Sequence, residues 1–281
     1  MTTSINKAND NFSSVGIIGC GWLGKALATR LLEKGRSVLA TTSKASNVEQ
    51  LGAMGINAQQ LTLPTSVEQL IAHDIFAQHC LVIAIPPQFR LGKADYADKI
   101  ALLVNVAQQR GLVQRIILVS STAVYNDLAG QVNEDNALNL TTEKVQVLNQ
   151  AEKIALNFSK QSNVLRLAGL VGPERHPGKF LLANKTLSNS RAPVNLIHQK
   201  DAVGLIESLL QEKYIPGIFN GVSDTHISKQ EYYQAAATAL ALTLPTMSQE
   251  TISNESKIVS GEKAKYVLGY KFVYPDLLTW L

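Results

Sequence analysis

A glycine pattern near the start of the chain limits the folds that this sequence can adopt. An apolar run at residues 15–18 leads into glycines spaced Gly-x-Gly-x-x-Gly, and leucines with helical spacing follow at 23–34. Such glycines permit a tight turn, let the backbone approach a pyrophosphate and let the helix pack on the strand. Free N–H groups at the start of that helix attract phosphate. The pattern predicts a dinucleotide site formed by Gly19, Cys20, Gly21, Trp22, Leu23 and Gly24. A strand–helix turn that binds no ligand is the alternative.

Strands and helices alternate through the first two thirds of the chain. Strand-like apolar runs occupy residues 37–41, 80–85, 115–119 and 163–167, and helical patterns occupy 94–110 and 141–160. This alternation is typical of an α/β protein and predicts a Rossmann-type, doubly wound parallel sheet. Ligands of such sheets bind beyond the carboxyl ends of the strands. The strand ends add these expected cofactor-binding residues: Thr42, Ser43, Lys44, Ile85, Pro86, Pro87, Ser120 and Ala168.

The alternation weakens after about residue 170, where glycine and proline become frequent. We therefore expect a flexible tail at residues 1–14 and an NAD(P)-binding Rossmann domain at 15–168. Residues 169–281 are expected to form a smaller C-terminal substrate-binding lobe, with segments that return to the sheet.

Composition and charge argue against several classes of protein. The 281 residues carry a net charge of +4, but no dense Lys/Arg run, so we expect no nucleic-acid partner and a small anionic ligand instead. No apolar run reaches the roughly 20 residues of a membrane span, and residues 1–14 do not resemble a signal peptide. Cys20 and Cys80 form no CxxC pair, so we expect neither a disulfide nor a zinc site. Free cysteines are typical of a reducing compartment, so we expect a cytoplasmic location.

The end of the second strand bears on the choice of dinucleotide. Folds that prefer NAD usually carry Asp or Glu there, to bind the ribose 2′-hydroxyl. In this chain Thr42 occupies that position, and Ser43 and Lys44 follow. A hydroxyl and an ammonium suit a 2′-phosphate, so NADP(H) is the preferred cofactor and NAD(H) the alternative.

Four later segments resemble a known family. They are residues 120–125 (Ser-Ser-Thr-Ala-Val-Tyr), 165–173, 194–203 and 217–220. In order and spacing they resemble the extended short-chain dehydrogenases/reductases, which include the nucleoside-diphosphate-sugar epimerases and dehydratases. The resemblance covers residues 15–240 and implies NAD(P)-dependent chemistry on a hydroxylated, phosphate-bearing small molecule.

The chain departs from this family at its catalytic pair. Typical members carry Tyr-x-x-x-Lys on the helix after the Ser-Ser strand, where the tyrosine moves a proton and the lysine lowers its pKa. No tyrosine of this chain has lysine four residues later, and Lys144 and Leu148 take the two positions. The resemblance implies that Ser121 orients the substrate, with a hydroxyl that caps the strand end or touches the cofactor as the alternative. Tyr125, Lys144 or water could replace the missing acid/base.

A basic stretch across a Gly/Pro-rich loop suggests where a phosphate-bearing substrate binds, since arginine forks match phosphate oxygens. The expected substrate-binding residues are Arg166, Arg175, His176 and Lys179. A solvated basic loop is the alternative.

Two functions of different class follow. The first is an NAD(P)-dependent oxidoreductase or epimerase that acts on a nucleotide-sugar-like substrate. The second is a non-catalytic NADP(H)-binding redox sensor. The persisting substrate-side segments favour the enzyme, whereas the missing catalytic pair favours the sensor. The resemblance also implies a homodimer formed through the helices at 94–110 and 141–160.

Overall fold

A computed structural model describes residues 14–92, 94–181, 186–187, 189–243, 246–247 and 256–281. Apart from Ser14, the tail expected at residues 1–14 lies outside these ranges. Across them, no helix has the length and apolar character needed to cross a membrane.

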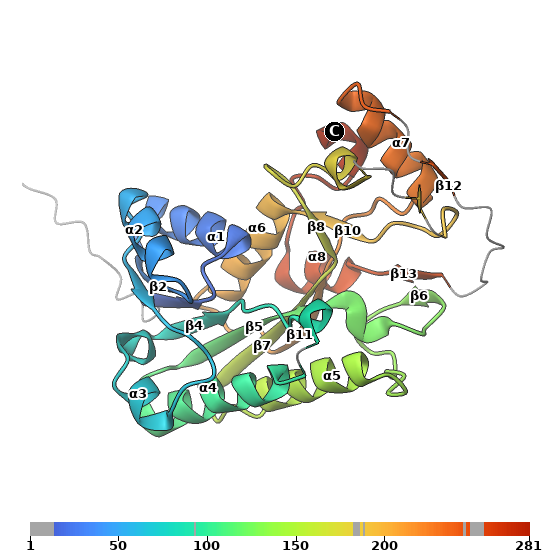
Figure 1. Ribbon diagram of the computed structural model, residues 1–281. Helices are drawn as coiled ribbons and strands as arrows, with labels where there is room; N and C mark the ends of the chain where they lie inside the picture. The colour runs from blue at the N-terminus through green and yellow to red at the C-terminus, as the bar shows by residue number, and fades with distance from the viewer. Residues whose placement is uncertain (1–13, 93, 182–185, 188, 244–245, 248–255) are drawn as a thin grey trace, which may run out of the picture.

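Seven parallel strands form the central sheet of the molecule (Figure 1). Their order is β11-β7-β5-β4-β1-β2-β3, so β1 lies between β2 and β4, where the direction of winding reverses. This confirms the predicted Rossmann-type fold. The strands are β1 (Ser14–Ile18), β2 (Ser37–Thr42), β3 (Ala58–Gln60), β4 (Cys80–Ile83), β5 (Arg115–Ser121), β7 (Gln161–Leu167) and β11 (Gly217–Gly221).

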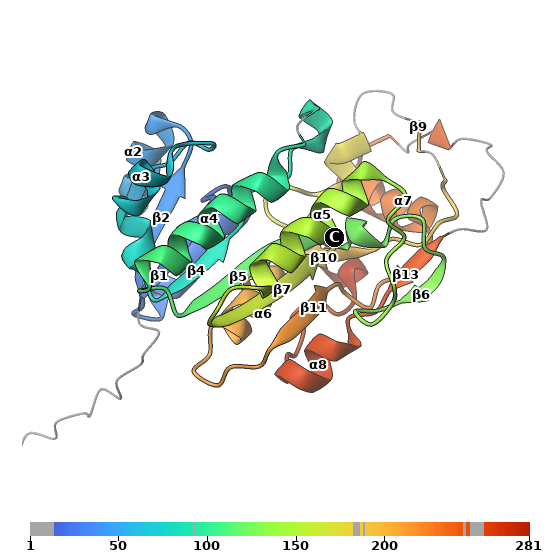
Figure 2. The same cartoon turned by 90° about the horizontal axis from the view of Figure 1, so that it is seen from below.

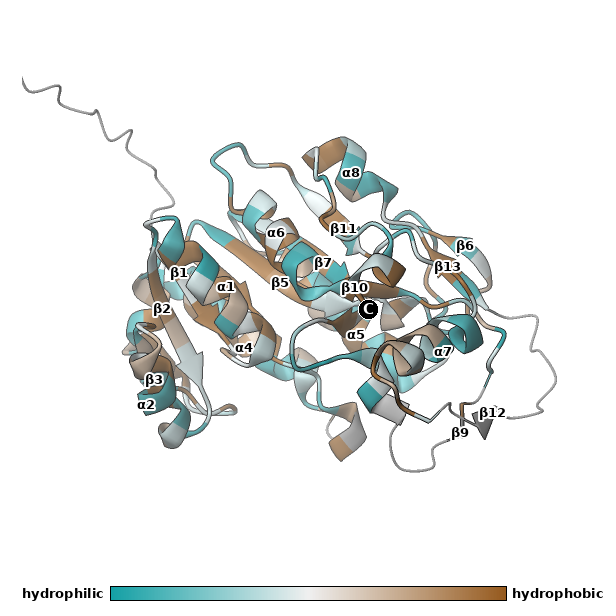
Figure 3. Cartoon of the chain, turned by 90° about the horizontal axis from the view of Figure 1, so that it is seen from above, coloured by the Kyte–Doolittle hydropathy of each residue, from teal (hydrophilic) through white to brown (hydrophobic). Residues whose placement is uncertain are grey.

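Helices cover both faces of the sheet, as the burial of its apolar strands requires. On one face lie α4 (Tyr96–Arg110) and α5 (Glu143–Leu156), side by side (Figure 2). On the other lie α1 (Trp22–Glu33) and α6 (Gln199–Leu209), which also contact each other (Figure 3). All four residues of β4 are buried between these layers.

The helix after β5 is shorter than the sequence pattern predicts. A helix was expected over residues 141–160, but α5 ends at Leu156, with Asn157 as its C-cap. The chain then turns so that Gln161 can pair with Arg115 of β5. Pairing also extends β5 past the predicted residue 119 to Ser121, opposite Leu167 of β7.

The last third of the chain contributes both to the sheet and to a separate group of small elements. Strand β11 pairs with β7 in the main sheet, and α8 (Glu262–Leu268) packs beside it. Among the described residues, three two-stranded parallel pairs lie outside the main sheet: β8 (Gly169–Val171) with β10 (Leu196–His198), β6 (Gly130–Val132) with β13 (Lys257–Val259), and β9 (Thr186–Leu187) with β12 (Thr246–Met247).

A second, smaller apolar cluster packs β8 and β10 against α7 and the C-terminal 3₁₀ turn, whereas Val132 of β6 and Val259 of β13 belong to the main core. The buried members of the smaller cluster are Val171, Val194, Tyr232 and Leu277, of which Tyr232 lies on α7 (Lys229–Ala239). The remaining helical segments are α2 (Ala45–Ala53), α3 (Val67–Ile71) and the 3₁₀ turns Asp74–Ala77, Phe89–Leu91, Thr122–Tyr125, Pro177–Leu181 and Leu277–Trp280.

Candidate functional site

The loop between β1 and α1 has the geometry that its glycines predict. Gly19 has a φ of +100°, and a Cβ there would lie 2.9 Å from the backbone of Ala84. A Cβ on Gly24 would lie 2.7 Å from the carbonyl oxygen of Gly19, so the helix can approach the strand only without one. A Cβ on Gly21 would meet nothing within 4 Å. Gly21 is also the N-cap of α1 and has no side chain to bond the first-turn N–H groups, which stay free for an anion.

A cavity of about 560 Å³ lies on the β2 side of this loop, and we name it the β2-side cavity. Its lining includes Gly19, Cys20 and Gly21 from the loop and Thr42 and Ser43 from the end of β2. Thr42 accepts a hydrogen bond at Oγ1 from the Asn47 amide, at 3.2 Å. Burial raises the pKa of the Cys20 thiol to about 11, so it stays protonated and acts as a small apolar group.

A second cavity of about 260 Å³, the central cavity, lies beyond the ends of β4 and β5. It shares the lining residues Gly19, Gly21, Ala84, Ile85 and Pro86 with the β2-side cavity. Trp22 and Arg175 lie at its rim, with the Arg175 Cζ 4.3 Å from the centre of a Trp22 ring. The Trp22 indole N–H also donates to the carbonyl oxygen of Pro173 at 2.8 Å, which ties the 172–175 turn to the start of α1.

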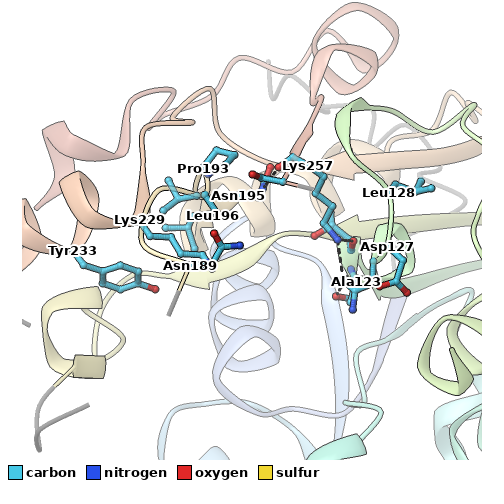
Figure 4. Close-up of a pocket in the computed structure, with 16 residues that line it drawn as sticks. Ala123, Asp127, Leu128, Asn189, Pro193, Asn195, Leu196, Lys229, Tyr233 and Lys257 are labelled. Atoms are coloured by element: carbon cyan, nitrogen blue, oxygen red, sulfur yellow. Dashed lines mark hydrogen bonds between the residues drawn. The ribbon is translucent and has the colours of Figure 1, made fainter. Parts of the chain in front are cut away.

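The third cavity, of about 510 Å³, is named the lobe cavity and lies between the end of β5 and the C-terminal elements (Figure 4). Ser121, Thr122, Ala123 and Asn126 line one end, where Lys257 reaches in, and Lys229 and Tyr233 of α7 line the other. Ser121 also lines the central cavity. The three cavities therefore adjoin, with the glycine loop and Ser121 at their two junctions.

Two residues expected in the site lie in a buried network beneath it. Arg166 of β7 makes a bidentate ion pair with Glu152 of α5, at 2.6 Å between Nη2 and Oε2. The Tyr125 hydroxyl accepts from Arg166 Nη1 at 2.7 Å and donates to Asn220 Oδ1 at 3.0 Å. Burial alone would lower the pKa of Arg166, but Glu152 raises it. Burial raises the pKa of Tyr125.

This network corrects two expectations from the sequence. Tyr125 is 0% exposed and its hydroxyl is fully engaged inside the protein, so it does not face the crevice as an acid/base would. Arg166 is 3% exposed and neutralises a buried carboxylate, so its guanidinium does not face the substrate side. The Ser120 hydroxyl belongs to the same network, because it donates to Glu152 at 2.6 Å, although the residue lines the central cavity.

Helix α5 presents no proton-transfer group to the central cavity. Leu148 lines it, at the position that the family resemblance assigned to a lysine. Lys144 is exposed on the first turn of α5 and lies outside the lining of the three cavities. Tyr96 of α4 lines the central cavity, and its buried hydroxyl has no hydrogen-bond partner among the described residues. A ligand hydroxyl could serve as that partner.

Four other expected residues lie outside the three cavities. Lys44 is the exposed N-cap of α2, and Ala168 is buried between β7 and β8. His176 packs against Trp280, with 5.2 Å between ring centres, and Lys179 is exposed. Arg175, expected on the substrate side, lies instead at the rim of the central cavity.

Sequence reasoning missed several lining residues. Lys99 and Asn47 line the β2-side cavity, and Lys229, Tyr233 and Lys257 line the lobe cavity. None belongs to a motif, and each reaches its cavity through tertiary packing. Across the described ranges, no three His, Cys, Asp or Glu side chains gather as a metal site would require.

Comparison with known proteins places the chain among sequence relatives. The family model described as "NADP oxidoreductase coenzyme F420-dependent" matches residues 14–90, which hold β1, β2 and the glycine loop. The Escherichia coli (strain K12) protein YeeZ is 35% identical over 271 residues, which cover 94% of this chain and 97% of YeeZ.

Solved structures show the same fold at lower identity. A protein of unknown function from Silicibacter pomeroyi is 21% identical, with a TM-score of 0.78 over 95% of each chain. The Bordetella bronchiseptica enzyme WbmG, solved in complex with NAD and UDP, is 20% identical, with a TM-score of 0.76 over 94% of this chain and 92% of WbmG. Both likenesses run through the sheet and the C-terminal elements, since they cover nearly the whole chain.

Proposed function

The chain belongs to the family of the Escherichia coli protein YeeZ and has the fold of the extended short-chain dehydrogenases/reductases, and on this premise we propose that it is an NAD(P)-dependent oxidoreductase or epimerase acting on a nucleotide-sugar-like substrate. The observation that carries the proposal is the row of three adjoining cavities. The β2-side and central cavities flank the glycine loop, and the central and lobe cavities meet at Ser121. A dinucleotide and a substrate need such connected space, because their reacting atoms must be in contact.

The residues around the glycine loop fit a dinucleotide. The open space beside Gly21 admits a pyrophosphate, and the first-turn N–H groups of α1 and the Arg175 guanidinium would hold its charge. When bound, the nicotinamide would supply the hydride donor or acceptor for the reaction.

The lobe cavity carries groups suited to a sugar nucleotide. Ser121 Oγ accepts a hydrogen bond from the Ala123 N–H at 3.1 Å, which leaves its own proton free to bond a substrate oxygen. At the far end of the cavity, Lys229 supplies positive charge for a phosphate and Tyr233 a phenol. WbmG, which has this fold, was solved with NAD and UDP, which supports the same ligand class here.

NADP(H) is the cofactor we propose. The described lining of the β2-side cavity contains no Asp or Glu, and it presents the hydroxyls of Thr42 and Ser43 together with Lys99, whose ammonium pairs with Asp95 at 2.8 Å. A 2′-phosphate beside the end of β2 would thus meet the hydroxyls of Thr42 and Ser43 and no lining carboxylate. The family model that matches residues 14–90 describes NADP oxidoreductases and supports this preference.

The test is calorimetric titration of NADPH and NADH into the wild type and a Gly21→Val variant. We expect NADPH to bind the wild type more tightly than NADH. The valine side chain would occupy the space beside Gly21, so NADPH affinity should fall at least about tenfold, or about 1.4 kcal/mol. Gly52→Val is the matched control, because Gly52 also has open space around it but lies on α2, outside the three cavities. The NADPH affinity of Gly52→Val should equal that of the wild type.

Turnover separates the two candidate functions. Wild type with NADP⁺ and UDP-glucose or UDP-glucuronic acid should raise the absorbance at 340 nm, or yield an epimer detected by NMR. Tight NADPH binding without turnover of any nucleotide sugar or keto compound would favour a non-catalytic redox sensor. Absence of binding by both dinucleotides, or equal binding by the Gly21→Val variant, would refute the cofactor site.

A further inference from the structure

The proposed reaction needs a group that moves a proton to or from the substrate hydroxyl, and α5 does not present one to the site. Tyr125 is committed to the buried network with Arg166 and Asn220. Resting on the proposed function, we propose that Lys257 of β13 is this proton carrier, and that it acts as a catalytic residue together with Ser121 at one end of the lobe cavity.

Strand pairing brings Lys257 to the reacting end of the site. β13 pairs in parallel with β6, which places Lys257 opposite Gly130, soon after the 3₁₀ turn that follows β5. The Asn195 amide fixes β13 from the other side, donating to the Lys257 carbonyl oxygen at 3.0 Å and accepting from the Val259 N–H at 2.7 Å. The backbone of Lys257 is therefore held between β6 and Asn195, which lines the lobe cavity.

The Lys257 side chain reaches the residues directly after Ser121. Its Nζ donates to the Thr122 carbonyl oxygen at 3.2 Å and to Asn126 Oδ1 at 2.9 Å. Figure 4 shows it extending toward Ala123 and Asp127 and away from Lys229 and Tyr233. An ammonium has three protons, so these two bonds orient Nζ and leave one proton for a ligand in the cavity.

The charges around Nζ favour its neutral form. Burial, followed by the positive charge of Lys144 on α5, lowers the pKa of Lys257 to about 8, while Asp127 acts in the opposite direction. The lining of the lobe cavity also contains the cation Lys229, which lies at the opposite end from Lys257. A proton carrier is most effective when its pKa lies near the working pH, and that condition holds here.

In the oxidative direction, the O–H proton of the substrate alcohol passes to the neutral amine of Lys257, which becomes an ammonium. The C–H hydride leaves for an oxidised nicotinamide dinucleotide, and the carbon–oxygen bond becomes a carbonyl. In the reductive direction the ammonium returns the proton to the oxygen. Ser121 holds that oxygen through its free hydroxyl proton in both directions.

The first test measures the lysine itself and does not depend on turnover. Acetic anhydride reacts with neutral amines only, so labelling of the intact protein across pH 6–11, followed by peptide mass spectrometry, gives a titration midpoint for each lysine. Lys257 should show a midpoint near pH 8. Lys153, exposed on α5, is labelled in the same samples as the comparison lysine. Lys144→Met should raise the Lys257 midpoint, whereas Lys153→Met should leave it unchanged.

The second test uses Lys257→Met and Lys257→Arg in turnover of UDP-glucose or UDP-glucuronic acid. Both should bind NADPH within twofold of the wild type, because Lys257 lies outside the β2-side and central cavities. Both should lower kcat by about 100-fold or more and remove the rise of oxidative activity through pH 8. Arginine keeps the charge but does not release its proton, so it separates proton transfer from charge alone.

The outcomes separate this inference from the proposed function. A Lys257 midpoint at the ordinary lysine value of about 10.4, wild-type kcat in Lys257→Met, or restored activity in Lys257→Arg would overturn the inference alone. A wild type that does not bind NADPH would instead overturn the proposed function. A midpoint near 8 together with a kcat defect in both variants at unchanged NADPH affinity supports the role of Lys257.

Discussion

His198, at the start of α6, lies in a buried aromatic setting. Its ring centre is 4.2 Å from that of Tyr274 and 4.9 Å from that of Trp280. Nδ1 accepts a hydrogen bond from the Lys200 N–H at 3.1 Å and so caps the helix. Burial, and then the charge of Lys200, lowers the pKa of His198 to about 4. The imidazole is therefore neutral in the folded protein at neutral pH, as an N-capping acceptor must be.

The His198 environment predicts a loss of stability in mild acid. An unfolded histidine takes up its proton near pH 6.5, whereas the folded one does so only near pH 4. The stabilisation is therefore complete above pH 6.5 and is lost as the pH falls toward 4. His198→Asn keeps a capping acceptor but does not titrate. In urea unfolding, the wild-type midpoint should fall more steeply from pH 7 to 4.5 than that of the variant. Parallel curves would contradict the assignment.

At the scale of elements, the turn at residues 172–175 closes over the glycine loop. Gly172 has a φ of +151°, and a Cβ there would lie 2.9 Å from Gln199 and 3.2 Å from the Trp22 ring. The Arg175 N–H donates to the Gly172 carbonyl oxygen at 2.9 Å, which completes the turn. This close packing positions the Arg175 guanidinium over Trp22 and at the rim of the central cavity.

This arrangement predicts that Arg175 contributes to dinucleotide affinity. Arg175→Gln should weaken NADPH binding by about tenfold, because one charge-assisted bond to the pyrophosphate is lost. Lys179→Gln, an exposed position on the same loop, should change the affinity less than twofold. Calorimetric titration of both variants checks the prediction. Equal effects would mean that the loop acts only through its net charge.

At the scale of the whole molecule, α4 and α5 form one outer face of the sheet (Figure 2). Leu102 of α4 and Val147 of α5 are only partly buried by the protein's own core. We propose that this face pairs with a second copy, as the family resemblance implies.

Light scattering tests this pairing. The wild type should have twice the chain mass of 30.5 kDa, and Leu102→Asp combined with Val147→Asp should have the mass of one chain. Val267→Asp, at an exposed position on α8, should leave the mass unchanged. If the wild type and the Leu102→Asp, Val147→Asp double variant have the same mass, the interface is refuted.

The sequence by itself determined five of the seven strands of the sheet and the cofactor loop, because these depend on local signals, whereas β3 and β11 had no such signal. The short apolar run at Cys80–Ile83 favours a buried strand, because prolines follow it at 86 and 87, and Gly19 adopts a positive φ where the chain turns toward α1. Parallel strands end at one edge, so Gly21, Thr42 and Ser121 could be placed on the same crevice from their positions alone.

Tertiary structure alone decided which of the other polar side chains face that crevice. Tyr125 follows Ser121 by one turn, yet it points into the protein because Arg166 and Asn220 hold its hydroxyl. Lys257 stands 135 residues beyond Thr122 and reaches it only through the pairing of β13 with β6. No local pattern encodes such a pairing, because it depends on packing between segments far apart in the chain. The glycine loop could therefore be predicted from the sequence, whereas the residue proposed to move the proton could not.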